Sequence, residues 1–220
     1  MITVVAVVCL GSGMTSATAA QARVGVKGGF NITDFHGGTS GTGDTFAETK
    51  NRHPAAGGLF VSIPIGSRVS ITPEVLLTGK GFKQNDVISG IPVEVTVKFN
   101  ALQFPLLLNV VLGPTDAVVT SRLFVGPAVT FELSCDLTFD RLLPELPCDD
   151  VADLDRESWD LEAIFGGALD IAGPGRFVFS LEARYDYGLR NLDAAAEPNN
   201  FNVKSRAFTF LGGVSLALGR

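Results

Sequence analysis

The chain has few of the residues on which enzymes and metal sites are built. Of its 220 residues, only two are His and three are Cys. It contains no Gly-x-Ser-x-Gly elbow, no His-Glu-x-x-His pair, no phosphate-binding loop and no Cys-x-x-Cys pair. Both histidines, His36 and His53, fall in one polar stretch that we interpret as a solvated loop. We therefore expect no catalytic residue, no cofactor site and no enzymatic activity.

Positive charge and long apolar runs are also scarce. The net charge is −6, and no cluster of Lys and Arg is interleaved with aromatic residues, which argues against nucleic acid as a partner. Hydrophobic residues make up 46% of the chain and the mean hydropathy is +0.31. Yet no run approaches the roughly 18 apolar residues of a membrane-spanning helix. If the chain enters a membrane, it does so as strands.

Segments that alternate apolar and polar residues are what the chain does contain. Residues 69–82 show the pattern best, because Val69, Ile71, Val75 and Leu77 share one face and Ser70, Thr72, Glu74, Thr78 and Lys80 share the other. Eight such segments occur, at residues 23–33, 55–65, 69–82, 93–112, 121–133, 159–171, 176–187 and 205–218. Each reaches the roughly 9 to 11 residues that a tilted strand needs to cross a bilayer.

The alternation is imperfect in two ways. Apolar residues occupy several positions of the polar face, namely Phe60, Leu76, Phe124, Ile164, Val178 and Leu211. In the fourth segment, the apolar positions shift by one residue between Phe99 and Leu102, which we interpret as a β-bulge in that strand.

The connections between the segments alternate between long and short. The long ones are residues 34–54, 83–92, 134–158 and 190–204, and the shorter ones are residues 66–68, 113–120 and 172–175. Short turns on one side and long loops on the other are typical of bacterial outer-membrane barrels. The predicted fold is therefore all-β, an eight-stranded antiparallel up-and-down transmembrane β-barrel with short periplasmic turns and long extracellular loops.

The first 22 residues resemble a secretory signal. An apolar stretch over residues 2–10 precedes the small-residue triplets Ala17-Thr18-Ala19 and Ala20-Gln21-Ala22, each of which fits a cleavage site. The basic residues that usually begin such a signal are missing. We expect a removed signal peptide at residues 1–22 and a barrel domain at residues 23–220.

Several stretches together resemble the porin-family outer-membrane β-barrel proteins. They are Val24-Gly25-Val26-Lys27-Gly28-Gly29-Phe30-Asn31, Ile71-Thr72-Pro73-Glu74-Val75-Leu76-Leu77 with Gly79-Lys80-Gly81-Phe82, Leu102-Gln103-Phe104-Pro105-Leu106-Leu107-Leu108, Phe124-Val125-Gly126-Pro127 and residues 176–189. The resemblance implies an eight-stranded barrel that is exported through the periplasm into the outer membrane, and it implies no defined activity. It also implies contact with outer-membrane lipid, with lipopolysaccharide and with the barrel assembly machinery, and we expect a monomer. Such barrels usually end in an aromatic residue, whereas this chain ends Leu218-Gly219-Arg220.

An eight-stranded barrel has a bore that side chains can fill. The charged residues of the polar face are expected to form a lumenal network: Lys27, Glu74, Lys80, Glu94, Lys98, Glu132, Glu162, Asp170, Glu182, Arg184 and Asp186. Such a network favours a structural or surface-interaction barrel with a plugged lumen. Two alternatives stay open at this stage, a narrow porin-like channel and a soluble lipocalin-like periplasmic carrier, because alternation alone does not say which face is inside.

The loop at residues 134–158 carries two further hypotheses. Cys135 and Cys148 are the pair left when the signal is removed, and outside the cell they are expected to form a disulfide. The acidic run at residues 148–157 lacks the Gly and terminal Glu of an EF-hand loop. We expect no metal site there, with weak divalent binding as the alternative.

Overall fold

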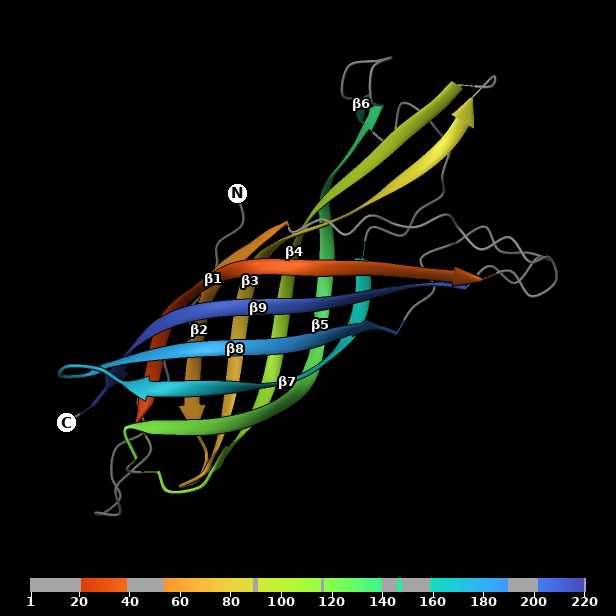
Figure 1. The fold of residues 1–220 in the computed structure, drawn as a ribbon. Helices are drawn as coiled ribbons and strands as arrows, with labels where there is room; N and C mark the ends of the chain where they lie inside the picture. Colours follow the sequence, from red (N-terminus) through yellow and green to blue (C-terminus); the bar gives the residue numbers. More distant parts are fainter. Residues whose placement is uncertain are drawn as a thin grey trace, which may run out of the picture.

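The computed structural model describes residues 21–38, 54–88, 91–115, 117–139, 146–147, 159–189 and 202–219. Its strands are β1 (Ala22–Gly38), β2 (Ala55–Pro64), β3 (Val69–Ile88), β4 (Ile91–Leu112), β5 (Val119–Phe139), β6 (Leu146–Pro147), β7 (Trp159–Ala172), β8 (Phe177–Gly188) and β9 (Asn202–Leu218). Figure 1 shows them as one curved sheet that closes on itself. The predicted signal peptide lies outside the described residues up to residue 20, and β1 begins at Ala22.

Eight of these strands form the wall of a closed barrel. The hydrogen-bonded order is β4-β3-β2-β1-β9-β8-β7-β5, and pairing between β4 and β5 closes the ring. Every pairing of the wall strands is antiparallel. The two-residue β6 pairs only with β5, at Asp136 and Leu137, and adds nothing to the wall. The predicted eight-stranded up-and-down barrel is confirmed.

The two faces of the wall differ as the alternation predicts. Along β8, Phe177, Phe179 and Leu181 are about half exposed, while Glu182 and Arg184 are buried. Exposed Val, Leu, Ile and Phe side chains recur in this way around the barrel, whereas charged and polar side chains are buried inside it. A lipocalin-like carrier would need apolar residues inside and charges outside, so this arrangement contradicts that alternative. Among the described residues, no helix has both the length and the apolar character needed to cross a membrane.

Short turns join the strands at one end of the barrel. Residues 65–68 join β2 to β3, and residues 173–176 join β7 to β8. Gly113, directly after β4, and Gly175, between β7 and β8, adopt φ values of 78° and 68°, a left-handed region that glycine enters without steric cost. Ala22 pairs with Leu218, so the first and last strands begin and end at this same end of the barrel.

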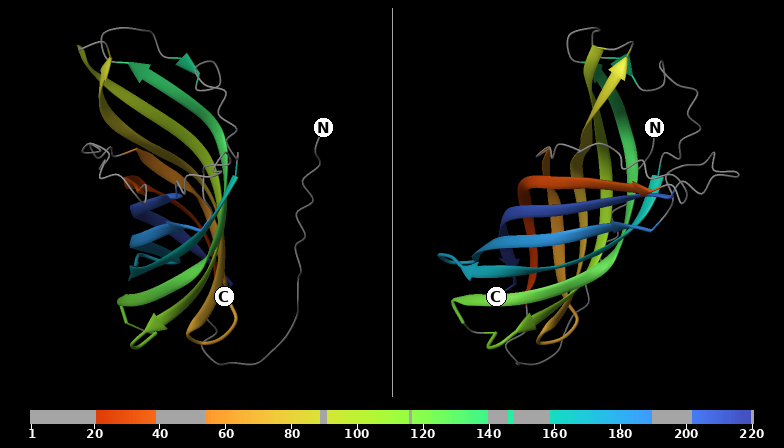
Figure 2. Two further views of the ribbon diagram at one scale, coloured as in Figure 1. Left: turned by 90° about the vertical axis from the view of Figure 1, so that its right-hand side faces the viewer. Right: turned by 45° about the vertical axis from the view of Figure 1, so that its right-hand side comes forward.

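The prediction of a loop at residues 83–92 is wrong. β3 and β4 continue through this stretch and pair as far as Ile88 with Ile91, so the connection is the tip of a long hairpin. With β5, this hairpin rises beyond the rest of the wall (Figure 2). The three strands have 20, 22 and 21 residues, about twice what a bilayer crossing requires.

The predicted bulge lies at the expected height but on the neighbouring strand. Pairing of β4 with β5 shifts between Asn100 and Ala101, where Ser134 and Glu132 are the successive partners and Leu133 is the extra residue. Pairing of β3 with β4 keeps one register from Val69 to Ile88, so β4 itself contains no insertion.

Candidate functional site

A cluster of buried ion pairs occupies the lumen. The ammonium Nζ of Lys27 on β1 lies 2.7 Å from Oε1 of Glu74 on β3 and 3.1 Å from Oε2 of Glu182 on β8. The guanidinium Nη2 of Arg184 lies 3.0 Å from Oε2 of Glu74 and also pairs with Glu182. The four side chains are at most 2% exposed. Strands from opposite parts of the wall are thus tied together across the bore.

Glycines on the flanking strands make room for this cluster. Lys27 is directly opposite Gly58 on β2 and Gly213 on β9. A Cβ atom on Gly213 would lie 2.7 Å from the hydroxyl of Ser180 and 3.3 Å from the Cβ of Lys27. Because neither neighbour carries a side chain, the Lys27 chain can extend across the lumen to Glu74 and Glu182.

Arg122 on β5 extends the cluster toward the end with the short turns. Its Nη2 lies 3.2 Å from Oε2 of Glu182, and its Nε lies 3.2 Å from Oδ2 of Asp170 on β7. Its Nη1 donates a hydrogen bond of 2.7 Å to Oδ1 of Asn109. At the edge of the cluster, Nη1 of Arg23 lies 3.1 Å from Oδ2 of Asp170, and the Arg23 side chain is 22% exposed.

Charge within the cluster is balanced. The buried cations Lys27, Arg122 and Arg184 face the buried anions Glu74, Asp170 and Glu182. Each carboxylate contacts at least two cations, which is the condition under which ions are tolerated away from water. The rings of two inward-pointing residues add cation–π contacts, with Lys27 4.8 Å from the centroid of Phe60 and Arg122 5.5 Å from that of Phe124.

Apolar side chains pack beside the ions and narrow the lumen further. One buried group consists of Leu107, Phe124, Ala128, Ile164 and Ala168 from β4, β5 and β7. Gly166 accommodates the Phe124 ring, because a Cβ atom there would lie 2.6 Å from its Cζ and 2.3 Å from the carbonyl oxygen of Ala183. Several of the apolar residues that looked like imperfect alternation in the sequence therefore fill the bore: Phe60, Leu76, Phe124, Ile164 and Leu211 are buried there.

Neutral donors hold two further carboxylates in the lumen. Glu162 accepts a hydrogen bond of 3.0 Å from the hydroxyl of Thr130 and another from Nε2 of Gln103. Asp186 accepts one of 3.1 Å from the hydroxyl of Thr209. Both carboxylates are buried in the wall interior, beside the hydroxyl and amide groups that donate to them.

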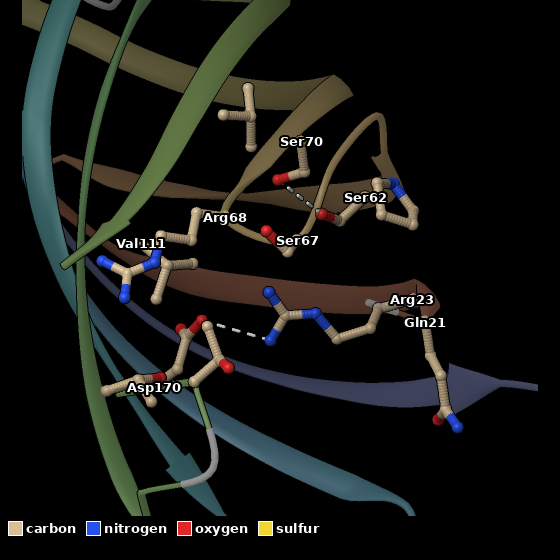
Figure 3. Close-up of a pocket in the computed structure, with 12 residues that line it drawn as sticks. Gln21, Arg23, Ser62, Ser67, Arg68, Ser70, Val111 and Asp170 are labelled. Atoms are coloured by element: carbon tan, nitrogen blue, oxygen red, sulfur yellow. Dashed lines mark hydrogen bonds and ion pairs between the residues drawn. The ribbon is translucent and has the colours of Figure 1, made fainter. Parts of the chain in front are cut away.

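Two hollows that share lining residues lie in the described part of the lumen. A cavity of about 300 Å³ opens at the end with the short turns, and its walls include Arg23, Arg68 and Asp170 (Figure 3). A hollow of about 10 Å³, lined by Lys27, Arg122 and their neighbours, shares Arg23, Ser62 and Asp170 with it. The bore therefore narrows from a small vestibule to the volume of about one water molecule at the ion cluster.

The predicted lumenal residues fall into three groups. Lys27, Glu74, Asp170, Glu182 and Arg184 lie together in the ion cluster, and Glu162 and Asp186 lie buried elsewhere in the lumen. Glu132 on β5 and Lys98 on β4 are half-buried. The side chains of Lys80 and Glu94 lie outside the part of the chain whose side chains the structure describes.

Sequence reasoning missed Arg122, Arg23 and Asn109. Arg122 has the same strand parity as the buried Phe124 and Ala128, and this parity could have identified it as a lumenal residue. Cys135 is disulfide-bonded, and its predicted partner Cys148 lies outside the described residues, as does the acidic run at residues 148–157. Within the described ranges, no three His, Cys, Asp or Glu side chains gather as metal ligands.

Comparison with known proteins adds a family and a set of barrels. The family model described as "Outer membrane protein beta-barrel domain" matches residues 16–194. Among solved structures, the chain is similar to Neisserial surface protein A, with 10% identity and a TM-score of 0.52 over 90% of this chain and 97% of that one. It is also similar to the outer membrane protein OprG of Pseudomonas aeruginosa, with 15% identity and a TM-score of 0.49 over 92% and 98%. No curated protein matches. At 10% identity, the likeness to Neisserial surface protein A shows a shared fold alone.

Proposed function

The chain belongs to the outer membrane protein beta-barrel domain family, and we propose that this outer-membrane barrel is of a structural or surface-interaction type. In this proposal its lumen is sealed, it has no catalytic activity, and its contribution to the cell comes from the surface it presents outside the membrane.

The observation that carries the proposal is the filled lumen. Four ionic side chains bridge the bore, and each is at most 2% exposed: Lys27, Glu74, Glu182 and Arg184. The hollow beside them measures about 10 Å³. A solute that passed this point would have to separate buried ion pairs, and breaking one such pair costs roughly 3 to 5 kcal/mol. The narrow-channel alternative requires that separation in every opening.

The strands that rise beyond the wall support a role in surface contact. β3, β4 and β5 have 20, 22 and 21 residues, and roughly 9 to 11 suffice to cross the bilayer. The short turns mark the periplasmic end in this family of folds, so the remaining length stands on the outer side. Lipopolysaccharide, matrix components or neighbouring cells are the partners that we propose for this surface.

A shortened hairpin tests the surface role. Replacing residues 84–95 by Asn-Gly would join Lys83 to Thr96, which are paired in the structure, through a two-residue turn that keeps the register. We expect cells that produce this variant to adhere less to matrix-coated surfaces and to other cells, while the barrel still folds and shows heat-modifiable migration. Arg176→Gln, in the turn between β7 and β8, serves as the control at the opposite end. The proposal is contradicted if cells with the original barrel, with the shortened hairpin and with Arg176→Gln all adhere only as well as cells without the barrel.

Two assays of the purified protein address the other parts of the proposal. Liposomes that contain the barrel should swell in an isosmotic sugar solution no faster than protein-free liposomes, because the bore is filled. The barrel should also release no fatty acid from phospholipid or lipopolysaccharide. Rapid swelling would support the channel, and sustained fatty acid release would contradict the absence of catalysis.

A further inference from the structure

The vestibule, the cavity at the end with the short turns, has the size and the polar lining of a small binding site. Its volume is about 300 Å³, at the lower end of the range for small-molecule pockets. Strand ends and short turns from around the barrel supply its lining, and the ion cluster closes its inner end. Figure 3 shows Arg23 and Asp170 linked across the space, with Ser67 and Arg68 projecting from the turn between β2 and β3.

Positive charge is in excess around this cavity. The carboxylate of Asp170 is already held by Arg23 at 3.1 Å and by Arg122 at 3.2 Å. Arg68 is exposed, lines the same cavity and forms no ion pair with any described residue. Among the described residues, the cavity is lined by two cations, Arg23 and Arg68, and by one anion, Asp170, which is an excess of one positive charge. That excess stands in a chain whose net charge is −6.

Neutral hydrogen-bonding groups surround the two guanidinium groups. Hydroxyls line the cavity at Ser62, Ser67, Ser70, Thr115 and Thr120. Guanidinium groups bind carboxylate and phosphate oxygens through paired N–H donors, and hydroxyls can bond the remaining oxygens of a sugar or a phosphate. A neutral apolar ligand would leave these groups unpaired, and a cation would face the excess positive charge.

We propose that the vestibule binds a small periplasmic anion that carries a phosphate or carboxylate group on a hydroxylated body about the size of one sugar unit. Arg68 and Arg23 hold the anionic group, and the serine and threonine hydroxyls hold the body. The ligand stops at the ion cluster, because the hollow beyond the vestibule measures about 10 Å³. The site is therefore a receptor on the periplasmic face, and it does not depend on any surface partner on the outer side.

Three sugars of similar size test the site. The barrel, labelled for backbone NMR and held in nanodiscs, is titrated with glucose 6-phosphate, glucuronate and glucose. We expect saturable binding of one or both anions, with amide shifts gathered at Ser67, Arg68, Ser70, Thr115 and Thr120. Stronger binding of glucose 6-phosphate points to a phosphate ligand and stronger binding of glucuronate to a carboxylate ligand.

A matched pair of variants separates a built site from diffuse attraction. Arg68→Gln should weaken binding of the better anion by roughly tenfold, the value of one charge-assisted hydrogen bond. Arg176→Gln removes the same charge from the same end, but its guanidinium bonds the carbonyl oxygen of Gly219 and does not line the cavity, so it should change binding by less than about twofold. Two results with the variants and the neutral sugar would overturn the proposal: equal weakening of binding by both variants, or binding of glucose as tight as that of the anions. It would also be overturned if the amide shifts lay at the outer loops or if neither anion reached saturation.

Discussion

Replacing Glu182 by Gln removes the acceptor that three buried cations share. Glu182 contacts Lys27, Arg122 and Arg184, and its carboxylate is one of three that balance those three cations. Glutamine keeps the size of the side chain and loses its charge. The variant therefore leaves one uncompensated positive charge in a region where the ionic side chains are 9% exposed or less.

The size of the effect follows from the burial of these ions. Removing one partner of a buried ion pair typically costs about 3 to 5 kcal/mol, because the remaining charge stays away from water. Lys27→Met leaves the opposite imbalance, one negative charge in excess, and should cost a similar amount. The double variant Lys27→Met/Glu182→Gln restores the balance, so its cost should fall below the sum of the single costs by roughly 1 to 3 kcal/mol.

Urea unfolding of the barrel in lipid vesicles measures these differences. Trp159 is the only tryptophan and is 42% exposed on the outer face, so its fluorescence reports loss of the membrane-embedded state. Heat-modifiable migration on gels gives an independent count of folded barrels. If the free energy of unfolding of Glu182→Gln lies within about 1 kcal/mol of that of the original protein, or if the double variant costs as much as the two single changes together, charge balance in the cluster does not stabilise the barrel.

Three further changes test other parts of the structure. Leu77→Arg places a charge on a side chain that is 59% exposed to lipid and should cost up to roughly 2 to 4 kcal/mol in insertion, while Leu77→Phe at the same position should insert normally; equal insertion would argue against a lipid-facing Leu77. Gly166→Ala should destabilise the barrel by roughly 1 to 3 kcal/mol in urea unfolding because its Cβ would meet the carbonyl oxygen of Ala183 and the Phe124 ring, whereas Gly167→Ala, with no atom nearer than 3.4 Å, should be close to neutral. Similar stabilities of the two alanine variants would contradict this close packing of Gly166. Cys135→Ser should still assemble and migrate as a heat-modifiable barrel, since Cys135 lies near the end of β5, which its pairing with β4 already holds in place; failure to assemble would assign the bond a role in folding.

The wall of the barrel was predictable because lipid and lumen impose opposite demands on successive residues. Along β3, that demand separates Val75 and Leu77 from Glu74 and Thr78, and the structure buries the second pair only. Outside the bilayer, water reaches both faces of a strand, so the alternation disappears. The sequence of residues 83–92, with Lys83-Gln84-Asn85-Asp86, predicts a loop for this reason, although residues 83–88 belong to β3 and residues 91–92 to β4.

The contents of the lumen were predictable only in part. Strand parity identified Lys27, Glu74 and Glu182 as inward-facing, but it does not show which of them meet across the bore, since that depends on the relative heights of strands far apart in sequence. The one-residue shift near Ala101 showed that a bulge was present, yet a phase change does not say which of two paired strands holds the extra residue.

Single-channel recording in planar bilayers tests the sealed lumen most directly. The comparison needs the original barrel, Glu182→Ala/Arg184→Ala, which removes one charge of each sign from the cluster, and Leu181→Ala, which shortens an outward-facing side chain on the same strand. We expect no stable conductance of porin size from the original barrel or from Leu181→Ala, and measurable openings from the double variant. Long-lived, large openings from the original barrel as a purified monomer would contradict the sealed lumen.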